Sequence, residues 1–332
     1  MWEDALTRCK ELMVIFEDVI MDYSELAKLH SKIAEFYKKI MDPHNMRPEP
    51  EYFRVAYYGR GFPAFLQNKV FVYRGNGYER LGDFTSRILD QFPNAELMKK
   101  LTPPSKEVKE SPQQFLQINK VDCVMAENHK FSSPKVSESI QSYYRVNHVK
   151  TFTYSRPFHR GQKDSSNEFA TLCMEKTILH TSYELPGILR CFPVSNSETE
   201  ELSPLENAIE SMQNANNDLT EIVKKHYKNQ TLPLHPLTSK LNGMVDPAVM
   251  GGVANYEKAF VNDEYLQHHP DDADKVRMLQ EHIAKQVPLL EIGLHIHGSR
   301  INDAPLVVPL HKHMLVSFQN MKSQVQEKHG VA

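Results

Sequence analysis

The sixteen histidines are the residues of this chain best able to do chemistry, and two pairs are closely spaced, His295 with His297 and His311 with His313. A zinc site in a protein needs about four ligands around one point. Residues two apart on a helix point in different directions, and no cysteine or suitably spaced carboxylate completes a set near either pair. We therefore expect no metal site, and we expect these histidines to lie on the surface.

Two further motifs are incomplete versions of nucleotide-binding or catalytic signatures. Gly75-x-Gly77 lacks the third glycine of a dinucleotide fingerprint, and the sequence contains no G-x-x-x-x-G-K-[ST] phosphate loop. Ser203 could be taken for a nucleophile. However, Ser203-Pro204-Leu205-Glu206 combines an N-cap serine, a proline at the first helical position and a capping-box glutamate. The sequence thus predicts no covalent chemistry and no bound cofactor.

Composition limits the classes of protein to which the chain can belong. It has 332 residues, 40% of them hydrophobic, which suffices for two or three compact cores. A formal net charge of −3 offers no basic surface for nucleic acid. Four dispersed cysteines suit a reducing cytosol, and no apolar run has the length of a membrane span. Because helical periodicity begins at Met1, we expect a fragment of a longer protein.

Hydrophobic periodicity divides the chain into three zones, residues 1–48, 49–200 and 201–332. The first has two helical patterns that meet at Asp22, a potential N-cap, and predicts an antiparallel helix pair too small to stand alone. The second is rich in strands and the third in amphipathic helices. The order of these three zones along the chain predicts an α+β protein: a helix pair, an antiparallel β-sheet lobe and a four-helix bundle with an interrupted helix.

Within the second zone, the first strands are expected at Tyr52–Tyr58 and Lys69–Tyr73, which are rich in β-branched and aromatic residues. The glycines of Arg74–Gly77 then predict a hairpin turn that leads into another strand at Tyr78–Leu81. Because the strands arrive in runs rather than alternating with helices, the sheet is predicted to be antiparallel.

The interrupted helix is the most informative part of the third zone. Its helical pattern is broken at Val245-Asp246-Pro247 and again at Gly251-Gly252, because proline cannot donate to the helical ladder and glycine removes backbone restraint. The pattern predicts a short loop that presents an apolar tip, Ala248, Val249 and Met250, to the outside. Such loop residues more often tuck into the core, so on pattern alone a binding role is the minority interpretation.

Five segments carry a resemblance to a known family. They are Tyr57–Pro63 (YYGRGFP), Phe71–Arg80 (FVYRGNGYER), Ser142–Val149 (SYYRVNHV), Leu202–Glu210 (LSPLENAIE) and Val245–Phe260 (VDPAVMGGVANYEKAF). Together they resemble the second DOCK-homology region, the exchange-factor domain of DOCK proteins, and in particular its Rac-directed Dock-one-eighty subgroup. The resemblance covers nearly the whole chain and implies a three-lobe plan, of whose first lobe only the last helices are present.

The resemblance also implies the functional residues. It makes Val249 the nucleotide sensor, and the loop that holds it consists of Asp246, Pro247, Ala248, Met250, Gly251 and Gly252. It matches Leu202, Ser203 and Pro204 to a triplet tied to exchange activity, and it makes Asn255 and Tyr256 weaker candidates for contact with a GTPase. For the triplet, a helix cap whose loss unfolds the following helix remains an equally good explanation.

The implied function is guanine-nucleotide exchange on a Rac-like Rho-family GTPase, in which Val249 displaces the Mg²⁺ ion that helps to hold GDP. GDP, GTP and Mg²⁺ would belong to the GTPase. The alternative is a non-catalytic scaffold that binds a GTPase without driving release. The family also implies an adaptor protein and lipid that bind outside this chain, a homodimer contact in the truncated first lobe, and a cytoplasmic protein recruited to the plasma membrane.

Overall fold

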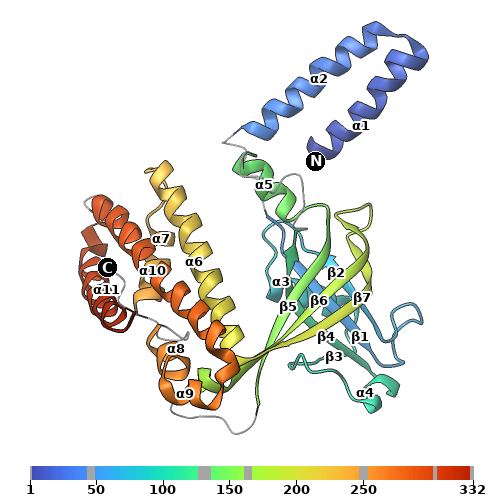
Figure 1. Cartoon of the computed structure of the whole chain (residues 1–332). Helices are drawn as coiled ribbons and strands as arrows, with labels where there is room; N and C mark the ends of the chain where they lie inside the picture. Colours follow the sequence, from blue (N-terminus) through green and yellow to red (C-terminus); the bar gives the residue numbers. More distant parts are fainter. Residues whose placement is uncertain are drawn as a thin grey trace. The chain divides into compact units, whose positions relative to one another are not determined.

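The computed structural model describes residues 2–42, 49–125, 136–160, 167–246, 253–301 and 305–329 (Figure 1). It confirms the α+β organisation: a helix pair, an antiparallel sheet and a set of C-terminal helices. The chain forms two compact units, one made of Met1–Tyr154 with Thr177–Thr199 and the other of Ser155–Lys176 with Glu200–Ala332. Three long strands therefore contribute residues to both units.

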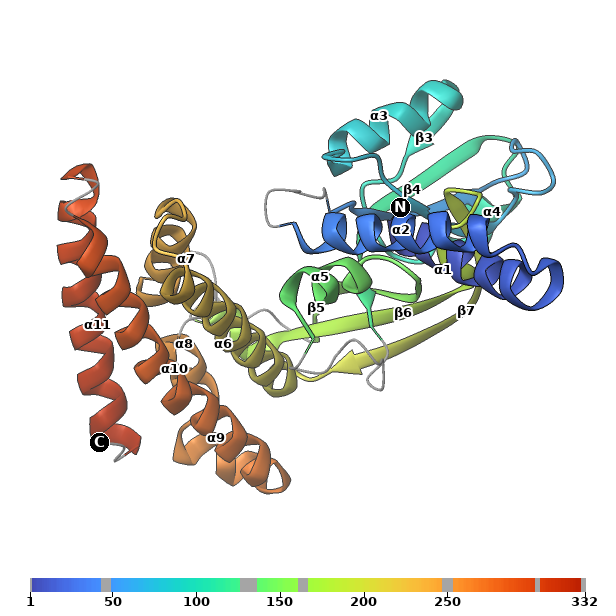
Figure 2. The ribbon, with the colours of Figure 1, turned by 90° about the horizontal axis from the view of Figure 1, so that it is seen from above.

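The N-terminal helix pair belongs to the first unit. Helix α1 spans Trp2–Val14, continues as a π-helix over Ile15–Ile20, and is followed by α2 over Tyr23–Met41. The Asp22 carboxylate accepts hydrogen bonds from the Ser24 and Glu25 amides at 3.1 and 3.0 Å, so the predicted N-cap is confirmed. The two helices lie side by side in both ribbon views (Figures 1 and 2).

Seven strands form the sheet: β1 (Tyr52–Tyr58), β2 (Lys69–Arg74), β3 (Ala95–Leu97), β4 (Gln114–Val124), β5 (Val149–His159), β6 (Leu172–Leu185) and β7 (Cys191–Leu202). Their order is β1-β2-β7-β6-β5-β4-β3, and β1 also pairs antiparallel with β4, which closes six strands into a ring. The short β3 adds to β4 in parallel. Closure leaves β1 without a free edge, and all seven of its residues are buried.

The hairpin predicted after β2 is wrong. Residues 78–80 form no strand, and helix α3 begins directly at Leu81 and runs to Gln91. The Glu79 carboxylate accepts from the Asn76 amide at 2.7 Å and pairs with Arg87 of α3 at the same distance, so it ties the loop to the helix instead of to a returning strand. Phe84 of α3 then stacks on Phe53 of β1, with ring centroids 4.2 Å apart.

The second unit is mainly helical. Its helices are η2 (Glu168–Thr171), α6 (Pro204–Lys228), α7 (His235–Val245), α8 (Val253–Phe260), α9 (Asp263–His268), η3 (Pro270–Asp272), α10 (Ala273–Arg300), η5 (Pro305–Val307) and α11 (Val308–His329). Two shorter helices, α4 (Lys106–Glu110) and α5 (Glu138–Arg145), belong to the first unit. Helix α10 packs against α6, α7 and α11 and continues through Pro288. The short α9 was not expected from the sequence.

The prediction that the paired histidines lie on the surface is wrong for two of the four. His297 on α10 is fully buried, and His311 on α11 is 7% exposed. Their rings stack with centroids 4.9 Å apart, because α10 and α11 cross where both side chains face inward. His295 and His313 are exposed, as expected.

Candidate functional site

The segment predicted to carry the sensor lies between two anchored helices. Helix α7 ends at Val245 and α8 begins at Val253, and both valines are 7% exposed. We call α7 the first stem and α8 the second stem. The predicted sensor and most of its loop lie outside the described residues: Pro247, Ala248, Val249, Met250, Gly251 and Gly252. Only a short segment therefore joins two fixed points.

The first stem is held by its apolar face and by its ends. Leu237 and Leu241 are fully buried in a cluster with side chains of α6, α10 and α11. At the end of the stem, Asp246 is exposed, its amide donates to the Asn242 carbonyl at 3.1 Å, and its carboxylate lies 3.3 Å from His313 Nε2. The predicted loop residue Asp246 thus terminates the helix rather than entering the core.

The second stem is short, with eight residues, and it packs against α6 and α10 and also against η2. Tyr256 is 6% exposed and meets Phe169 of η2 edge to face, with ring centroids 5.9 Å apart. The backbone carbonyl of half-buried Asn255 accepts from Asn167 Nδ2 at 2.9 Å. Burial raises the pKa of the Tyr256 hydroxyl. The ring of Tyr256 therefore belongs to the packing that holds the stem.

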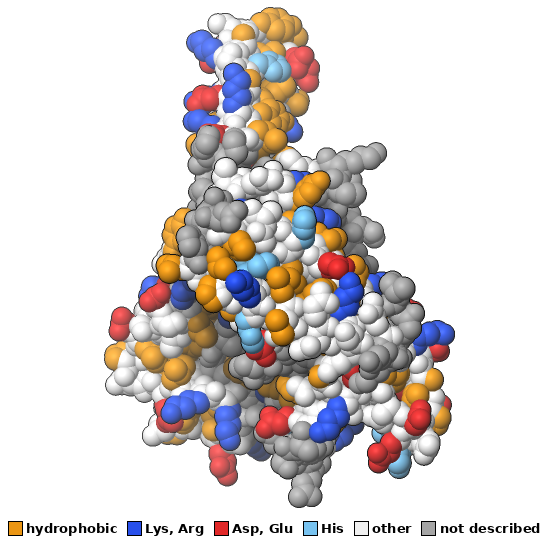
Figure 3. All heavy atoms as spheres, turned by 90° about the vertical axis from the view of Figure 1, so that its left-hand side faces the viewer, with side chains coloured by type: hydrophobic (Ala, Val, Ile, Leu, Met, Phe, Trp, Pro, Cys, Tyr) orange, Lys and Arg blue, Asp and Glu red, His pale blue; other side chains and the backbone are white. Residues whose placement is uncertain are grey.

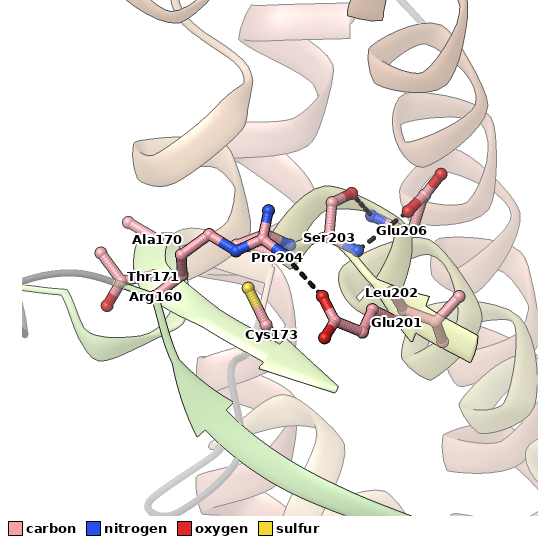
Figure 4. Close-up of a pocket in the computed structure, with 9 residues that line it drawn as sticks. All are labelled: Arg160, Ala170, Thr171, Cys173, Glu201, Leu202, Ser203, Pro204 and Glu206. Carbon is pink, nitrogen blue, oxygen red and sulfur yellow. Dashed lines mark hydrogen bonds and ion pairs between the residues drawn. The ribbon is translucent and has the colours of Figure 1, made fainter. Parts of the chain in front are cut away.

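The Leu202–Pro204 triplet lines a cavity of about 350 Å³ in the same unit (Figure 4). The other lining residues are Arg160, Ala170, Thr171, Cys173, Glu201 and Glu206. Arg160 Nη2 donates to Glu201 Oε2 at 2.5 Å across the cavity, and both side chains are more than half exposed. All three triplet residues are half-buried, so the triplet is partly accessible from the cavity.

Ser203 has a complete structural role at the start of α6. Its hydroxyl accepts from the Glu206 amide at 3.2 Å, and Glu206 Oε2 accepts from the Ser203 amide at 2.9 Å, which forms the predicted capping box. Lys275 of α10 donates to Glu206 Oε1 at 2.8 Å. The Lys275 hydrogen bond, followed by that from the Ser203 amide, lowers the pKa of Glu206 to about 2.

The polar side chains around the triplet are engaged in a helix cap and in ion pairs. In the described ranges, no group of three or more histidine, cysteine, aspartate or glutamate side chains could hold a metal ion. Sequence reasoning missed Asn167 and Phe169, which anchor the second stem from nearly ninety residues away, and Arg160, which faces Glu201. No local pattern marks these three residues, because their partners are distant in the chain.

Among the helices that the structure describes, none combines the length and the hydrophobicity that a membrane span requires.

Comparison with known proteins places the sequence in one family. Residues 101–184 match DHR-2, Lobe B, and residues 222–328 match DHR-2, Lobe C. Over 324 residues the chain is 40% identical to human dedicator of cytokinesis protein 4, and over 325 residues it is 39% identical to human dedicator of cytokinesis protein 3. Each alignment covers 98% of this chain but 16% of the relative.

A more distant relative comes from a plant. Over 321 residues, covering 91% of this chain, the sequence is 26% identical to the guanine nucleotide exchange factor SPIKE 1 of Arabidopsis thaliana. The chain corresponds to 17% of that protein. It therefore spans about a sixth of the length of each of these relatives.

Proposed function

The chain belongs to the DHR-2 family, of which it carries lobes B and C, and from this premise we propose that it is a guanine-nucleotide exchange module for a Rac-like small GTPase. The observation that supports this most directly is the pair of anchored stems on either side of residues 247–252 within the lobe C match. Two fixed helix ends joined by a short segment can present a loop tip to a partner with little loss of conformational entropy.

The proposed sensor is Val249. A GTPase holds GDP partly through Mg²⁺, which requires near-octahedral oxygen ligands at about 2.0–2.1 Å. Valine is compact, stiff at χ1 and has no ligand atom, so its entry into the site would displace the ion or its waters without replacing them. Loss of the ion would weaken GDP binding by a few kcal/mol, and each ~1.4 kcal/mol corresponds to tenfold in affinity.

The proposed position of Val249 also accounts for dissociation of the module from the GTPase after exchange. Incoming GTP with its Mg²⁺ competes with Val249 for one space, so nucleotide and exchange factor weaken each other's binding reciprocally. Gly251 and Gly252 precede the second stem, and because glycine restricts the backbone less than other residues do, they would allow the loop to move out of the nucleotide site. The module would therefore dissociate once GTP is bound.

The competing function is a scaffold that binds a GTPase without catalysing exchange. Release of fluorescent GDP from a Rac-type GTPase, measured with substoichiometric amounts of this chain, separates the two functions. Exchange requires each molecule of the module to act many times, and the release rate must exceed the intrinsic rate. If the chain binds nucleotide-free GTPase but never accelerates release, the scaffold is the correct function. The presence of valine at position 249 favours exchange, because a scaffold needs no tip that displaces an ion.

The role of the triplet can be tested at Ser203. Ser203→Ala removes the hydroxyl that caps α6 and should cost ~1 kcal/mol of unfolding free energy, whereas Ser203→Asn keeps a capping side chain and should restore most of it. If the residue acts as a cap, both stability and GDP release recover in the asparagine variant. Denaturant unfolding and GDP release are measured on the same preparations. Restored stability with release still impaired would instead show that Ser203 contacts the GTPase.

The helix pair is the proposed homodimer contact. Hydrophobic side chains gather along one side of it (Figure 3). Over the whole helix pair, the exposed large hydrophobic residues are Leu12, Val14, Ile15, Val19, Ile20, Met21, Tyr23, Tyr37 and Met41. Exposed hydrophobic side chains gathered in this way are a common mark of an interface. We place the adaptor protein and the lipid on regions outside this chain, and the whole protein in the cytoplasm with recruitment to the plasma membrane.

A further inference from the structure

One glycine lies where the first stem packs on α10. Gly293 is buried in the middle of this helix, and its neighbours on the inward side, Leu290 and Leu294, are 0% and 2% exposed. Glycine is among the poorest helix formers, because it loses the most backbone freedom and contributes no side-chain packing. A glycine inside a helix of 28 residues therefore calls for a reason in the packing around it.

The reason is the first stem itself. A β-carbon added at Gly293 would lie 2.8 Å from Leu241 Cδ2 of α7 and 3.3 Å from Val223 Cγ2 of α6. Carbon atoms that are not bonded pack best at about 3.5–4.0 Å. Position 293 thus has no room for a side chain, because Leu241 and Val223 occupy the space in which it would stand.

Neither of these two neighbours can move aside without disturbing the core. The tip of a leucine on the surface could rotate into solvent, but Leu241 is fully buried in one cluster with side chains of α6, α10 and α11. Val223 is 7% exposed, and its β-branched side chain is stiff at χ1. In a close-packed core, a methyl group at position 293 would therefore push the stem outward by about 1 Å, the difference between 2.8 Å and an ordinary contact.

A second contact between the same two helices depends on the same close approach. Thr238 Oγ1, one turn before Leu241 on α7, lies 2.8 Å from His297 Nε2, one turn after Gly293 on α10. Both side chains are buried. Moving the stem outward by about 1 Å would lengthen this contact beyond hydrogen-bonding distance. The missing side chain of Gly293 thus allows both contacts and fixes how deeply the stem lies.

The depth of the stem bears directly on the proposed sensor. Leu241 lies one turn before Val245, at which the stem ends, and residues 247–252 follow directly after Asp246. A displacement of about 1 Å at a group that takes part in a reaction can cost on the order of a hundredfold in rate. A stem that packs less deeply would present Val249 away from the position that displaces Mg²⁺.

We propose that Gly293 is a positioning residue: its missing side chain lets the first stem pack deeply against α6 and α10, and this depth places the sensor loop for GDP release. The role in exchange rests on the proposed function, whereas the close contact between Gly293 and Leu241 belongs to the folded chain. Gly293 touches neither the GTPase nor its nucleotide in this proposal.

The contact is tested by two substitutions that together conserve volume. Gly293→Ala adds one carbon, and Leu241→Val shortens the other side chain by one carbon and removes the contacting Cδ2. In Gly293→Ala, the maximal rate of GDP release from a Rac-type GTPase should fall at least about fivefold. Leu241→Val leaves a gap and should lose about two- to threefold. The double variant should recover to within about twofold of wild type, rather than lose the product of both factors.

A general loss of folding would not give this result. Binding of nucleotide-free GTPase, which has no Mg²⁺ to displace, should stay within about threefold of wild type in all three variants. Gly82→Ala is the matched control, because Gly82 is exposed on α3 of the first unit and an added β-carbon there meets nothing within 4 Å. It should change neither release nor binding. Release and binding that fall in parallel in Gly293→Ala would overturn the proposal.

Two further results would also overturn it. Gly293→Ala that releases GDP like wild type would show that Leu241 gives way without moving the stem, and a double variant that loses the product of the single factors would show no coupling. If Gly293→Ala does not fold, the double variant decides: it should fold and catalyse release, and its failure to do so contradicts the proposal. If wild type itself releases no GDP, the proposed function fails, and the role of Gly293 in exchange fails with it.

Discussion

Val249→Ala should reduce the rate of GDP release from a Rac-type GTPase about 100-fold, close to the intrinsic rate. The alanine methyl removes the two γ-carbons that would occupy the Mg²⁺ site, and the loss corresponds to ~2.7 kcal/mol of the effect of the sensor on nucleotide affinity. Because the residue lies between two anchored stems, the substitution should leave the unfolding free energy within ~0.5 kcal/mol of wild type. Release is followed with a fluorescent GDP analogue at catalytic amounts of the chain.

Two further substitutions separate volume from chemistry at this position. Val249→Ile keeps a β-branched apolar tip and should retain most of the exchange rate. Val249→Thr keeps the shape but offers an oxygen that Mg²⁺ can accept as a ligand, so it should lose most of the activity. Val316→Ala, which trims an exposed valine on α11, is the matched control and should exchange like wild type. Retained activity in Val249→Ala would mean that another residue of the loop is the sensor.

The elements that local signals define were predictable from the sequence. Helix α6 begins at Pro204, as predicted, because the Ser203 cap, the proline and the glutamate act within one turn. The strand Tyr52–Tyr58 was likewise predicted to the residue, since its β-branched and aromatic composition suits a fully buried strand. The break between the two stems also follows from local residues.

What the sequence could not show depends on distant partners. The glycines after β2 are typical of a hairpin, but no strand follows them at residues 78–80, where the Glu79 carboxylate pairs with Arg87 of α3. The burial of His297 and His311 requires α10 and α11 to cross at those positions, which no spacing along either helix reveals. The anchors of the second stem, Asn167 and Phe169, are hidden for the same reason.

Phe260→Ala should remove the main packing contact of the second stem. It therefore tests whether exchange requires both stems to be anchored. Phe260 is 1% exposed, packs in one cluster with residues of α6 and α10, and meets Tyr265 edge to face at 5.4 Å. Truncating a buried phenylalanine costs ~3–5 kcal/mol. An eight-residue helix is not stable by itself, so α8 should open locally before the unit unfolds.

Exchange should therefore fall at least tenfold in Phe260→Ala at a temperature where the chain is still folded, because a loop fixed at only one end must be ordered anew at each encounter. Hydrogen exchange of the α8 amides and denaturant unfolding are measured beside GDP release. Phe65→Ala, which removes an exposed ring from the first unit, is the control and should alter none of the three. If α8 opens freely and exchange is unchanged, the first stem alone suffices to present Val249. The requirement for two fixed ends would then be wrong, while the sensor itself could still be correct.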